Sequence, residues 1–417
     1  MMLPAIKTAV FCVLGAAGAG AVLLFTVSGP SNPARLLIAS AFATQSPLFD
    51  RETPEEVIVV EPQTVHLKTP EPMYAIYMTQ CAVGTPSLRN SLVEFIDNTQ
   101  LNAVIIDIKD YSGRISFSSE NPALADSTSP ACGARDMKEF IEKLHDKGIY
   151  VIGRITVFQD PFYAKAHPEQ SVQSKSRSGE PWKDYKGLSF VAVNSEPFWD
   201  YIVELSKESY AIGFDELNYD YIRWPSDGPM SDIVYPSKDY AGELEKFFWH
   251  LHAEIKPTGA VMSADLFGMT TTNVDDLNIG QVLERTLPYF DYVAPMVYPS
   301  HYPKSFLGLG NPNSDPYKVV QYSMSHAVRR ALATTTPVVS FAHERIGTST
   351  PAVYAKPVHD PKKLRPWLQD FDYGKDYLPA DIDAQIRATY DAGLTSWFFW
   401  DPANRYDSLR QVLKNNQ

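Results

Sequence analysis

The chain has 417 residues, of which 44% are hydrophobic and 21% are charged. This composition excludes a globally disordered chain and allows one large folded domain with additional segments. The net charge of −12 argues against a nucleic-acid partner, because a surface that binds phosphates must be basic. Aromatic residues make up 12% of the chain, which suits either a large core or a sugar-binding cleft.

The first 27 residues are predicted to form an apolar helix that directs export. Residues 8–27 carry no charge and are long enough to span a membrane. An uncleaved signal-anchor is favoured over a cleaved signal peptide, because the cleavage-like triplet Ala41-Phe42-Ala43 lies well past the apolar segment. The protein is therefore expected to be extracytoplasmic, with this helix as its membrane anchor, or secreted.

Residues 28–72 are predicted to be a linker, because they are rich in Pro, Ser, Thr and Glu. The remaining residues, 73–417, are predicted to be the functional domain. This domain holds Cys81 and Cys132, whose separation matches no zinc-binding motif. A disulfide, which an extracytoplasmic location permits, and two free thiols both remain open for this pair.

From Met73 onward, short apolar runs alternate with helical patterns. Residues 103–109, for example, are rich in β-branched side chains, which predicts a strand buried on both faces. Eight such strands with intervening helices predict an α/β fold, a (β/α)8 TIM barrel. A doubly wound open sheet is the alternative, but the chain lacks a Gly-rich phosphate motif. The predicted strands are 73–79, 103–109, 150–157, 213–221, 260–267, 292–298, 337–342 and 396–400, and the predicted helices are 87–98, 136–147, 197–210, 240–255, 275–287, 317–333, 379–392 and 407–414.

Polar side chains that follow these strands are the candidate site residues, because active sites of such barrels lie at the carboxyl ends of the strands. A barrel mouth ringed by carboxylates and aromatic rings suits glycosidic cleavage. That reaction needs one carboxylic acid to protonate the leaving oxygen and one carboxylate as nucleophile or base. The candidates for substrate binding are Asp107, Asp110, Glu216, Arg223, Tyr298, His301, Glu344, Trp400 and Asp401.

The fourth predicted strand carries the sharpest signal, in the sequence FDELNYDYIRWPSDG. Because side chains alternate along a strand, Glu216, Asn218 and Asp220 share one face, which we expect to point into the barrel. Asp220 is nearest the carboxyl end, where a substrate would bind. Arg223 is expected to pair with Asp220 and keep it ionised, and a purely structural ion pair is the alternative.

This segment belongs to a longer set of motifs that resembles a known family. The others are NAVIIDIKDYSGRISF, SADLFGMTT, YVAPMVYPSHY, RPWLQDF and WFFWDPANRY, and together they resemble a family of glycosyl hydrolase domains of TIM-barrel type. The resemblance covers residues 74–406 and implies an α-amylase-like barrel with a hydrolytic role. In the amylase manner, Asp220 is then the nucleophile and Asp265, on the fifth strand, the general acid.

Two departures from known patterns qualify the catalytic assignment. Amylase-type enzymes have Glu where this chain has Asp265, so Glu344 and Asp107 are substitutes for the acid. The chain is also weakly similar to chitinase-type barrels, whose fourth strand reads D-x-x-D-x-D-x-E. The final glutamate of that motif is Ile222 here, so chitinase chemistry is not implied.

The predicted function is glycoside hydrolysis of a cell-surface or extracellular polysaccharide by a two-carboxylate, retaining mechanism without metal or cofactor. A non-catalytic, surface-anchored carbohydrate-binding barrel in envelope or matrix assembly is the alternative, motivated by the missing glutamate on the fifth strand. A metal-dependent deacetylase on the same fold would need His301 and His343 as ligands.

Overall fold

The computed structural model describes residues 64–415. The predicted apolar helix, and the predicted linker up to residue 63, lie outside these residues. Among residues 64–415, no helix combines the length and the apolar character needed to cross a bilayer. The last part of the predicted linker lies against the barrel, since the Thr64 hydroxyl donates to the Ala211 carbonyl at 2.8 Å and the Leu67 amide donates to Asp215 at 2.6 Å.

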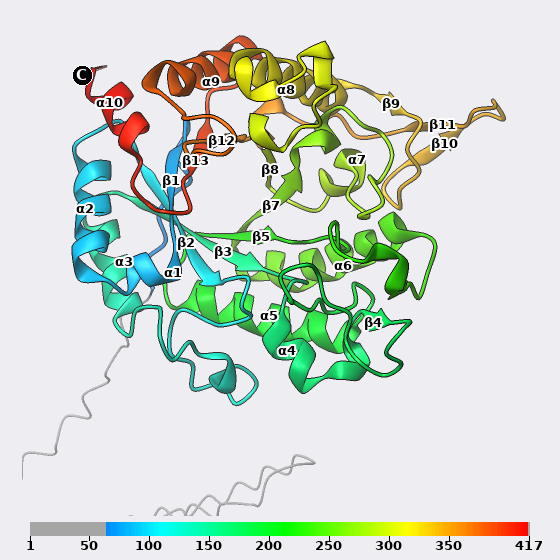
Figure 1. Cartoon of the computed structure of the whole chain (residues 1–417), viewed down its shortest axis with the longest axis horizontal. Helices are drawn as coiled ribbons and strands as arrows, with labels where there is room; N and C mark the ends of the chain where they lie inside the picture. Colours follow the sequence, from blue (N-terminus) through cyan, green and yellow to red (C-terminus); the bar gives the residue numbers. More distant parts are fainter. Residues whose placement is uncertain (1–63, 416–417) are drawn as a thin grey trace, which may run out of the picture. The chain divides into compact units, whose positions relative to one another are not determined.

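Eight parallel strands close into a barrel (Figure 1), which confirms the predicted TIM-barrel architecture and excludes the doubly wound open sheet. Strand β2 is buried along its whole length, as its run of β-branched residues predicts. In their order around the barrel, the strands are β1 (Tyr74–Met78), β13 (Trp397–Trp400), β12 (Trp367–Gln369), β8 (Tyr292–Met296), β7 (Val261–Phe267), β5 (Glu216–Asp220), β3 (Tyr150–Thr156) and β2 (Ala103–Lys109).

Helices cover the outside of the barrel, and α8 and α9 lie side by side beyond β12 and β13 (Figure 1). Several helices begin where the sequence supplies an N-cap: the Asp239 carboxylate accepts from the Gly242 amide at 2.9 Å, and the Asp315 carboxylate accepts from the Lys318 amide at 3.0 Å. The helices are α1 (Gln80–Val83), α2 (Pro86–Asp97), α3 (Met137–His145), α4 (Pro161–Ala166), α5 (Glu196–Ala211), α6 (Tyr240–Ile255), α7 (Leu283–Thr286), α8 (Pro316–Leu332), α9 (Pro379–Asp391) and α10 (Asp407–Asn415).

The predicted seventh strand at residues 337–342 is wrong, because the barrel strand at this place is β12. The apolar run instead forms an irregular segment tied to helix α6. The buried Glu245 carboxylate accepts from the Ser340 hydroxyl at 2.5 Å and from the Phe341 amide at 2.9 Å, so the backbone turns toward the helix. Phe341 is 63% exposed, whereas a large apolar side chain on a core strand would be buried.

Two small sheets lie outside the barrel. Strands β9 (Thr335–Thr336), β10 (Glu344–Ile346) and β11 (Val353–Ala355) form an antiparallel sheet, whose β10–β11 hairpin projects away from the barrel (Figure 1). Strands β4 (Gln173–Ser174) and β6 (Ile233–Val234) pair two long loops on the same side as helix α6.

The helix predicted at residues 275–287 is also wrong, since α7 covers only four of these residues. Leu277 and Asn278 adopt left-handed backbone conformations, with φ of 53° and 56°, and Gly280 follows with φ of 85°. Consecutive left-handed residues cannot continue a right-handed helix, so the segment turns before α7 begins.

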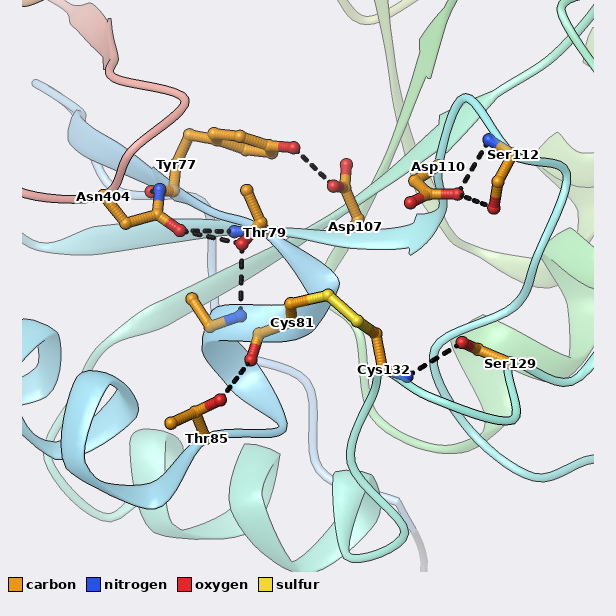
Figure 2. Close-up of a disulfide and its surroundings, with 11 residues drawn as sticks. Tyr77, Thr79, Cys81, Thr85, Asp107, Asp110, Ser112, Ser129, Cys132 and Asn404 are labelled. Atoms are coloured by element: carbon orange, nitrogen blue, oxygen red, sulfur yellow. Dashed lines mark hydrogen bonds between the residues drawn. A yellow bond between two sulfur atoms is a disulfide. The ribbon is translucent and has the colours of Figure 1, made fainter.

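Cys81 and Cys132 form a disulfide (Figure 2), which decides between the two states left open by the sequence. Their Cα atoms lie 4.5 Å apart. The bond joins α1, which directly follows β1, to the loop that precedes α3. It therefore ties together two loops at the carboxyl ends of neighbouring barrel strands.

Replacing both cysteines with serine is expected to lower the free energy of unfolding. The cross-link joins positions 51 residues apart, and the chain-entropy model assigns about 4 kcal/mol to a loop of that length. Denaturant titration of the double variant beside the parent measures this difference. A reducing agent should weaken the parent equally and leave the variant unchanged, and a stability that is the same in all four samples would contradict the expectation.

Candidate active site

The inward-facing side chains of β5 rise through the barrel in layers, as their alternation predicts. Glu216 is the deepest, and its carboxylate accepts from Arg365 at 2.9 Å and from the Tyr150 hydroxyl at 3.3 Å. All three side chains are buried and fill the lumen of the barrel. Glu216 therefore pairs inside the barrel and does not line the cavity at the carboxyl ends of the strands.

A cavity of about 300 Å³ opens above this layer, at the carboxyl ends of the strands. Asp220 at the end of β5 and Asp265 on β7 both line it, so the two predicted catalytic carboxylates share one space. Aromatic rings form much of the wall. The lining also includes Tyr77, Tyr298, His301, Trp367, Trp400 and Arg223.

Arg154 on β3 binds the carboxylates at the floor of this cavity. Its guanidinium lies 2.7 Å from Asp107, 2.5 Å from Asp220 and 3.9 Å from Asp265. Asp107 and Arg154 are register partners on β2 and β3, so the pairing of the strands places them together. Arg154 was not predicted from the sequence. Its signal there is a lone charge in the apolar run YVIGRIT, because a buried charge needs a partner.

The Asp220 carboxylate accepts three hydrogen bonds. Its Oδ2 accepts from Nη2 and Nε of Arg154 at 2.5 and 3.2 Å, and its Oδ1 accepts from the Tyr221 amide at 2.5 Å. Tyr221 has φ of 50°, so the backbone turns directly after β5. Hydrogen bonds and a neighbouring positive charge both stabilise the anion.

Asp265 has the opposite electrostatic character. Burial raises its pKa well above the usual range, and the negative charge of Asp220 raises it further. The side-chain amide of Asn218 and the indole Nε1 of Trp367 both donate to its Oδ1, at 2.9 and 2.8 Å. Neither donor contacts Oδ2, the oxygen nearer to Arg154. An acid with a raised pKa beside a second carboxylate is the arrangement that general acid catalysis requires.

Both carboxylates approach the same nitrogen of Arg154. The Oδ2 atoms of Asp220 and Asp265 lie 3.2 and 3.9 Å from the Nε atom of Arg154. The two Oδ2 atoms therefore cannot be farther apart than the sum of these two distances. This limit includes the ~5–5.5 Å separation typical of retaining glycosidases and the lower end of the ~6.5–9.5 Å range of inverting ones.

Three of the predicted substrate-binding residues form one aromatic wall of the cavity. The rings of Tyr298 and Trp400 lie 5.2 Å apart, and His301 lies 5.5 Å from Tyr298. Arg223 also lines the cavity, but the prediction that it pairs with Asp220 is wrong, because Asp220 binds Arg154 instead. The rings of this aromatic wall present flat faces against which a sugar can stack.

The other predicted substrate-binding residues lie outside the cavity lining. Asp107 lies beneath it and accepts from Arg154. It also accepts from the Tyr77 hydroxyl (Figure 2). Burial raises the pKa of Asp107 to about 6. Asp110 instead accepts from the amide and hydroxyl of Ser112, at 2.9 and 2.5 Å (Figure 2). These contacts show a supporting position for Asp107 and a turn-stabilising one for Asp110.

Asp401 and Glu344 are also placed away from the cavity. Asp401 accepts from the amides of Arg405 and Tyr406, at 2.7 and 3.1 Å, and so shapes the loop after β13. Glu344 is exposed on the β10–β11 hairpin, because the strand that was expected to precede it is not part of the barrel. The two histidines that a metal-dependent deacetylase would need are placed differently. His343 contacts the Val338 carbonyl in the segment that leads into this hairpin, whereas His301 lines the cavity.

Solved structures share this architecture. The PgaB (BpsB) glycoside hydrolase domain from Bordetella bronchiseptica is 16% identical over 82% of this chain and 99% of its own, with a TM-score of 0.54. The α-L-fucosidase isoenzyme 2 from Paenibacillus thiaminolyticus is 12% identical over 82% of this chain and 49% of its own, also with a TM-score of 0.54. At these identities the similarity shows the fold.

A hypothetical protein from Ruminiclostridium thermocellum ATCC 27405 is 28% identical over 46% of this chain and 96% of its own, with a TM-score of 0.41. No match to the chain was found among curated proteins. The profile of the family described as "Putative glycosyl hydrolase domain" matches residues 75–406, and the chain therefore belongs to this family of glycosyl hydrolase domains.

Proposed function

We propose that the protein is a retaining glycoside hydrolase in which Asp220 is the nucleophile and Asp265 the general acid and base. One observation carries the proposal: a buried acid with a raised pKa and a carboxylate bound to Arg154 line a single cavity at the carboxyl ends of the barrel strands. Glycosidic cleavage uses two such groups, one as the acid that protonates the leaving oxygen and the other as the nucleophile.

In the first step, the Oδ1 or Oδ2 lone pair of Asp220 attacks the anomeric carbon while Asp265 transfers its proton to the leaving glycosidic oxygen. The bond from the anomeric carbon to that oxygen breaks, and a glycosyl ester of Asp220 forms. In the second step, the Asp265 carboxylate takes a proton from water, whose oxygen attacks the anomeric carbon and releases Asp220 as the carboxylate.

The geometry explains how Asp265 changes its role between the two steps. In the free enzyme, the charge of Asp220 raises the pKa of Asp265. When Asp220 becomes an ester, that charge disappears, while the positive charge of Arg154 remains 3.9 Å away. The pKa of Asp265 therefore falls in the intermediate, so that the group is an acid before ester formation and a base after it.

We propose an oligosaccharide or polysaccharide outside the cytoplasm as the substrate. The wall formed by Tyr298, His301 and Trp400 supports a sugar, because its rings can stack against the faces of pyranoses. The disulfide between Cys81 and Cys132 supports an extracytoplasmic location, where such bonds persist. The uncharged residues 8–27 support a membrane anchor or an export signal.

Hydrolysis of a panel of aryl glycosides and oligosaccharides, in α and β forms, tests the proposed function. The configuration of the first product, followed by NMR before mutarotation, should equal that of the substrate. A first product of inverted configuration would overturn the retaining mechanism and leave hydrolysis in place.

A non-catalytic carbohydrate-binding barrel is the second candidate, and the burial of Asp265 favours it. This side chain is 1% exposed and one methylene shorter than glutamate, which limits its reach toward a leaving group. Binding of glycans by the parent without hydrolysis of any member of the panel would support this alternative against the enzyme.

Replacement of Trp367 with phenylalanine is expected to move the basic limb of the pH profile of kcat/KM to higher pH. The indole hydrogen bond favours the ionised form of Asp265, so its loss raises the pKa of the acid further. Activity is lost as pH rises through that pKa, because the acid must be protonated. The control is Trp397→Phe, which removes an indole bond to Tyr390. A limb that does not move in the Trp367 variant, or moves equally in both, would contradict the assignment.

A further inference from the structure

Arg223 is a buried cation without an acidic partner. Its side chain lines the cavity and the residue is 9% exposed. Its Nη1 donates to the Trp224 carbonyl at 3.2 Å, and its guanidinium lies 4.6 Å from the centre of the Tyr221 ring. Among residues 64–415 it forms no ion pair with a carboxylate.

The other buried arginines among the described residues have an acidic partner, which Arg223 lacks. Arg285 is 8% exposed and pairs with the buried Glu245 at 3.1 Å, and Arg365 is 2% exposed and pairs with the buried Glu216 at 2.9 Å. A buried charge without a partner is costly in free energy. Arg223 differs from both in facing the cavity, so its missing partner can be a ligand.

The position of Arg223 is fixed before any ligand arrives. Its neighbours Ile222 and Trp224 are fully buried. The Gln281 side-chain amide donates to the Ile222 carbonyl at 3.2 Å, and the Trp224 amide donates to the Ile279 carbonyl at 2.9 Å. A guanidinium held in this way loses little conformational freedom on binding, which favours affinity.

The remaining charged side chains in the lining are exposed, unlike Arg223. Lys186 and Asp227 both line the cavity and are both exposed, and Lys186 forms no ion pair within residues 64–415. The positive charge of Arg154 is matched by Asp220 and Asp107. Outside the catalytic group, the lining therefore carries two cations and one carboxylate.

We propose that the cavity binds a glycan that carries an anionic substituent, the carboxylate of a uronic acid, and that Arg223 recognises this group. The inference rests on the proposed hydrolase function and specifies its substrate class. A planar guanidinium matches a carboxylate with two parallel hydrogen bonds, and it matches a sulfate ester in a similar way. Arg223 lines the same cavity as Asp220 and Asp265, so the acidic group belongs to the part of the glycan that this cavity holds.

Paired substrates test the proposal: aryl glucuronides against glucosides, galacturonides against galactosides, and sulfated against unsulfated glycosides. The parent is expected to prefer the acidic member of a pair, as measured by the ratio of the two kcat/KM values. R223Q should lower that ratio by ~10–100-fold, since hydrogen bonds to a charged group contribute ~1.5–3 kcal/mol. A preference for sulfated over uronic substrates, lost in R223Q, would support the anion site with sulfate as its occupant.

R114Q is the matched control. Arg114 also stacks on a ring, at 3.7 Å from the centre of Phe162, and donates to a backbone carbonyl, that of Asp126, at 2.9 Å. It lies outside the cavity lining, so its replacement should leave the ratio unchanged. A parent that prefers neutral substrates, or an R223Q variant with the ratio of the parent, would overturn the proposal.

A binding experiment separates failure of this inference from failure of the hydrolase function. If no glycoside in the panel is hydrolysed, the proposed function fails, and calorimetry with oligogalacturonate and a neutral oligosaccharide of equal length still tests the site. Binding of oligogalacturonate by the parent that is lost in R223Q supports the anion site. Equal binding of both oligosaccharides, or undiminished binding by R223Q, overturns it.

Discussion

An Asp220→Asn variant is expected to fold like the parent and to hydrolyse its best substrate at least ~10⁴-fold more slowly, in line with the loss of a nucleophile in other enzymes. The amide cannot form the glycosyl ester, but Arg154 keeps its bond to Asp107 at 2.7 Å and so retains an acidic partner. Steady-state kinetics give the loss in kcat, and circular dichroism with thermal unfolding verifies the fold.

Two further variants make this result specific. Asp110→Asn removes an acid whose side chain, within the described residues 64–415, accepts hydrogen bonds only from Ser112. This variant should remain within about threefold of the parent, as expected for a residue that makes no catalytic contact. Asp220→Gly with added azide should form a glycosyl azide of inverted configuration, because the small anion occupies the space of the missing carboxylate. Near-parental turnover by the Asp220→Asn variant would remove Asp220 from the mechanism.

Arg154→Met is expected to lower the free energy of unfolding by ~3–5 kcal/mol, because it removes the cation from buried carboxylates. Asp107 and Asp220 both lose their ion pair, and the side chains of these acids are 2% and 5% exposed. Denaturant titration at pH 7 measures the loss. The deficit should shrink as pH falls from 7 through the raised pKa of Asp107, because protonation removes the uncompensated charge of that carboxylate.

An arginine on the surface of the same chain provides the control. Arg177 lies 3.6 Å from Glu180, and both side chains are about half exposed or more, at 47% and 62%. Its replacement with methionine should change the free energy of unfolding by less than ~1 kcal/mol at any pH. Equal losses in the Arg154 and Arg177 variants would show that the carboxylates at the floor of the cavity do not depend on Arg154.

Much of the barrel could be predicted because periodicity is a local property of the sequence. Alternation along β5 correctly placed Glu216, Asn218 and Asp220 on the inner face. Strand β12 was missed because it has only three residues, while the longer apolar run at 337–342 resembled a strand. That error also assigned Glu344 to the mouth of the barrel, because its predicted position relied on a barrel strand at 337–342 that does not exist.

The chemistry of the site was less accessible to sequence reasoning because it depends on contacts between distant strands. Arg154 meets Asp107 through the register of β2 and β3, and it meets Asp220 across β3 and β5, and no spacing in the sequence encodes either contact. The protonation of Asp265 likewise follows from its burial and from donors on β5 and β12. Residue type indicated which acids were candidates, whereas packing determines their roles.

The ion pair between Glu216 and Arg365 has a consequence for turnover. It blocks the barrel below the cavity, so nothing passes through the strands toward their amino ends. Incoming glycan and departing fragment must use the same entrance, one after the other. The released sugar therefore occupies the route of the next molecule, and accumulating product should act as a competitive inhibitor that slows the reaction before the starting material is exhausted.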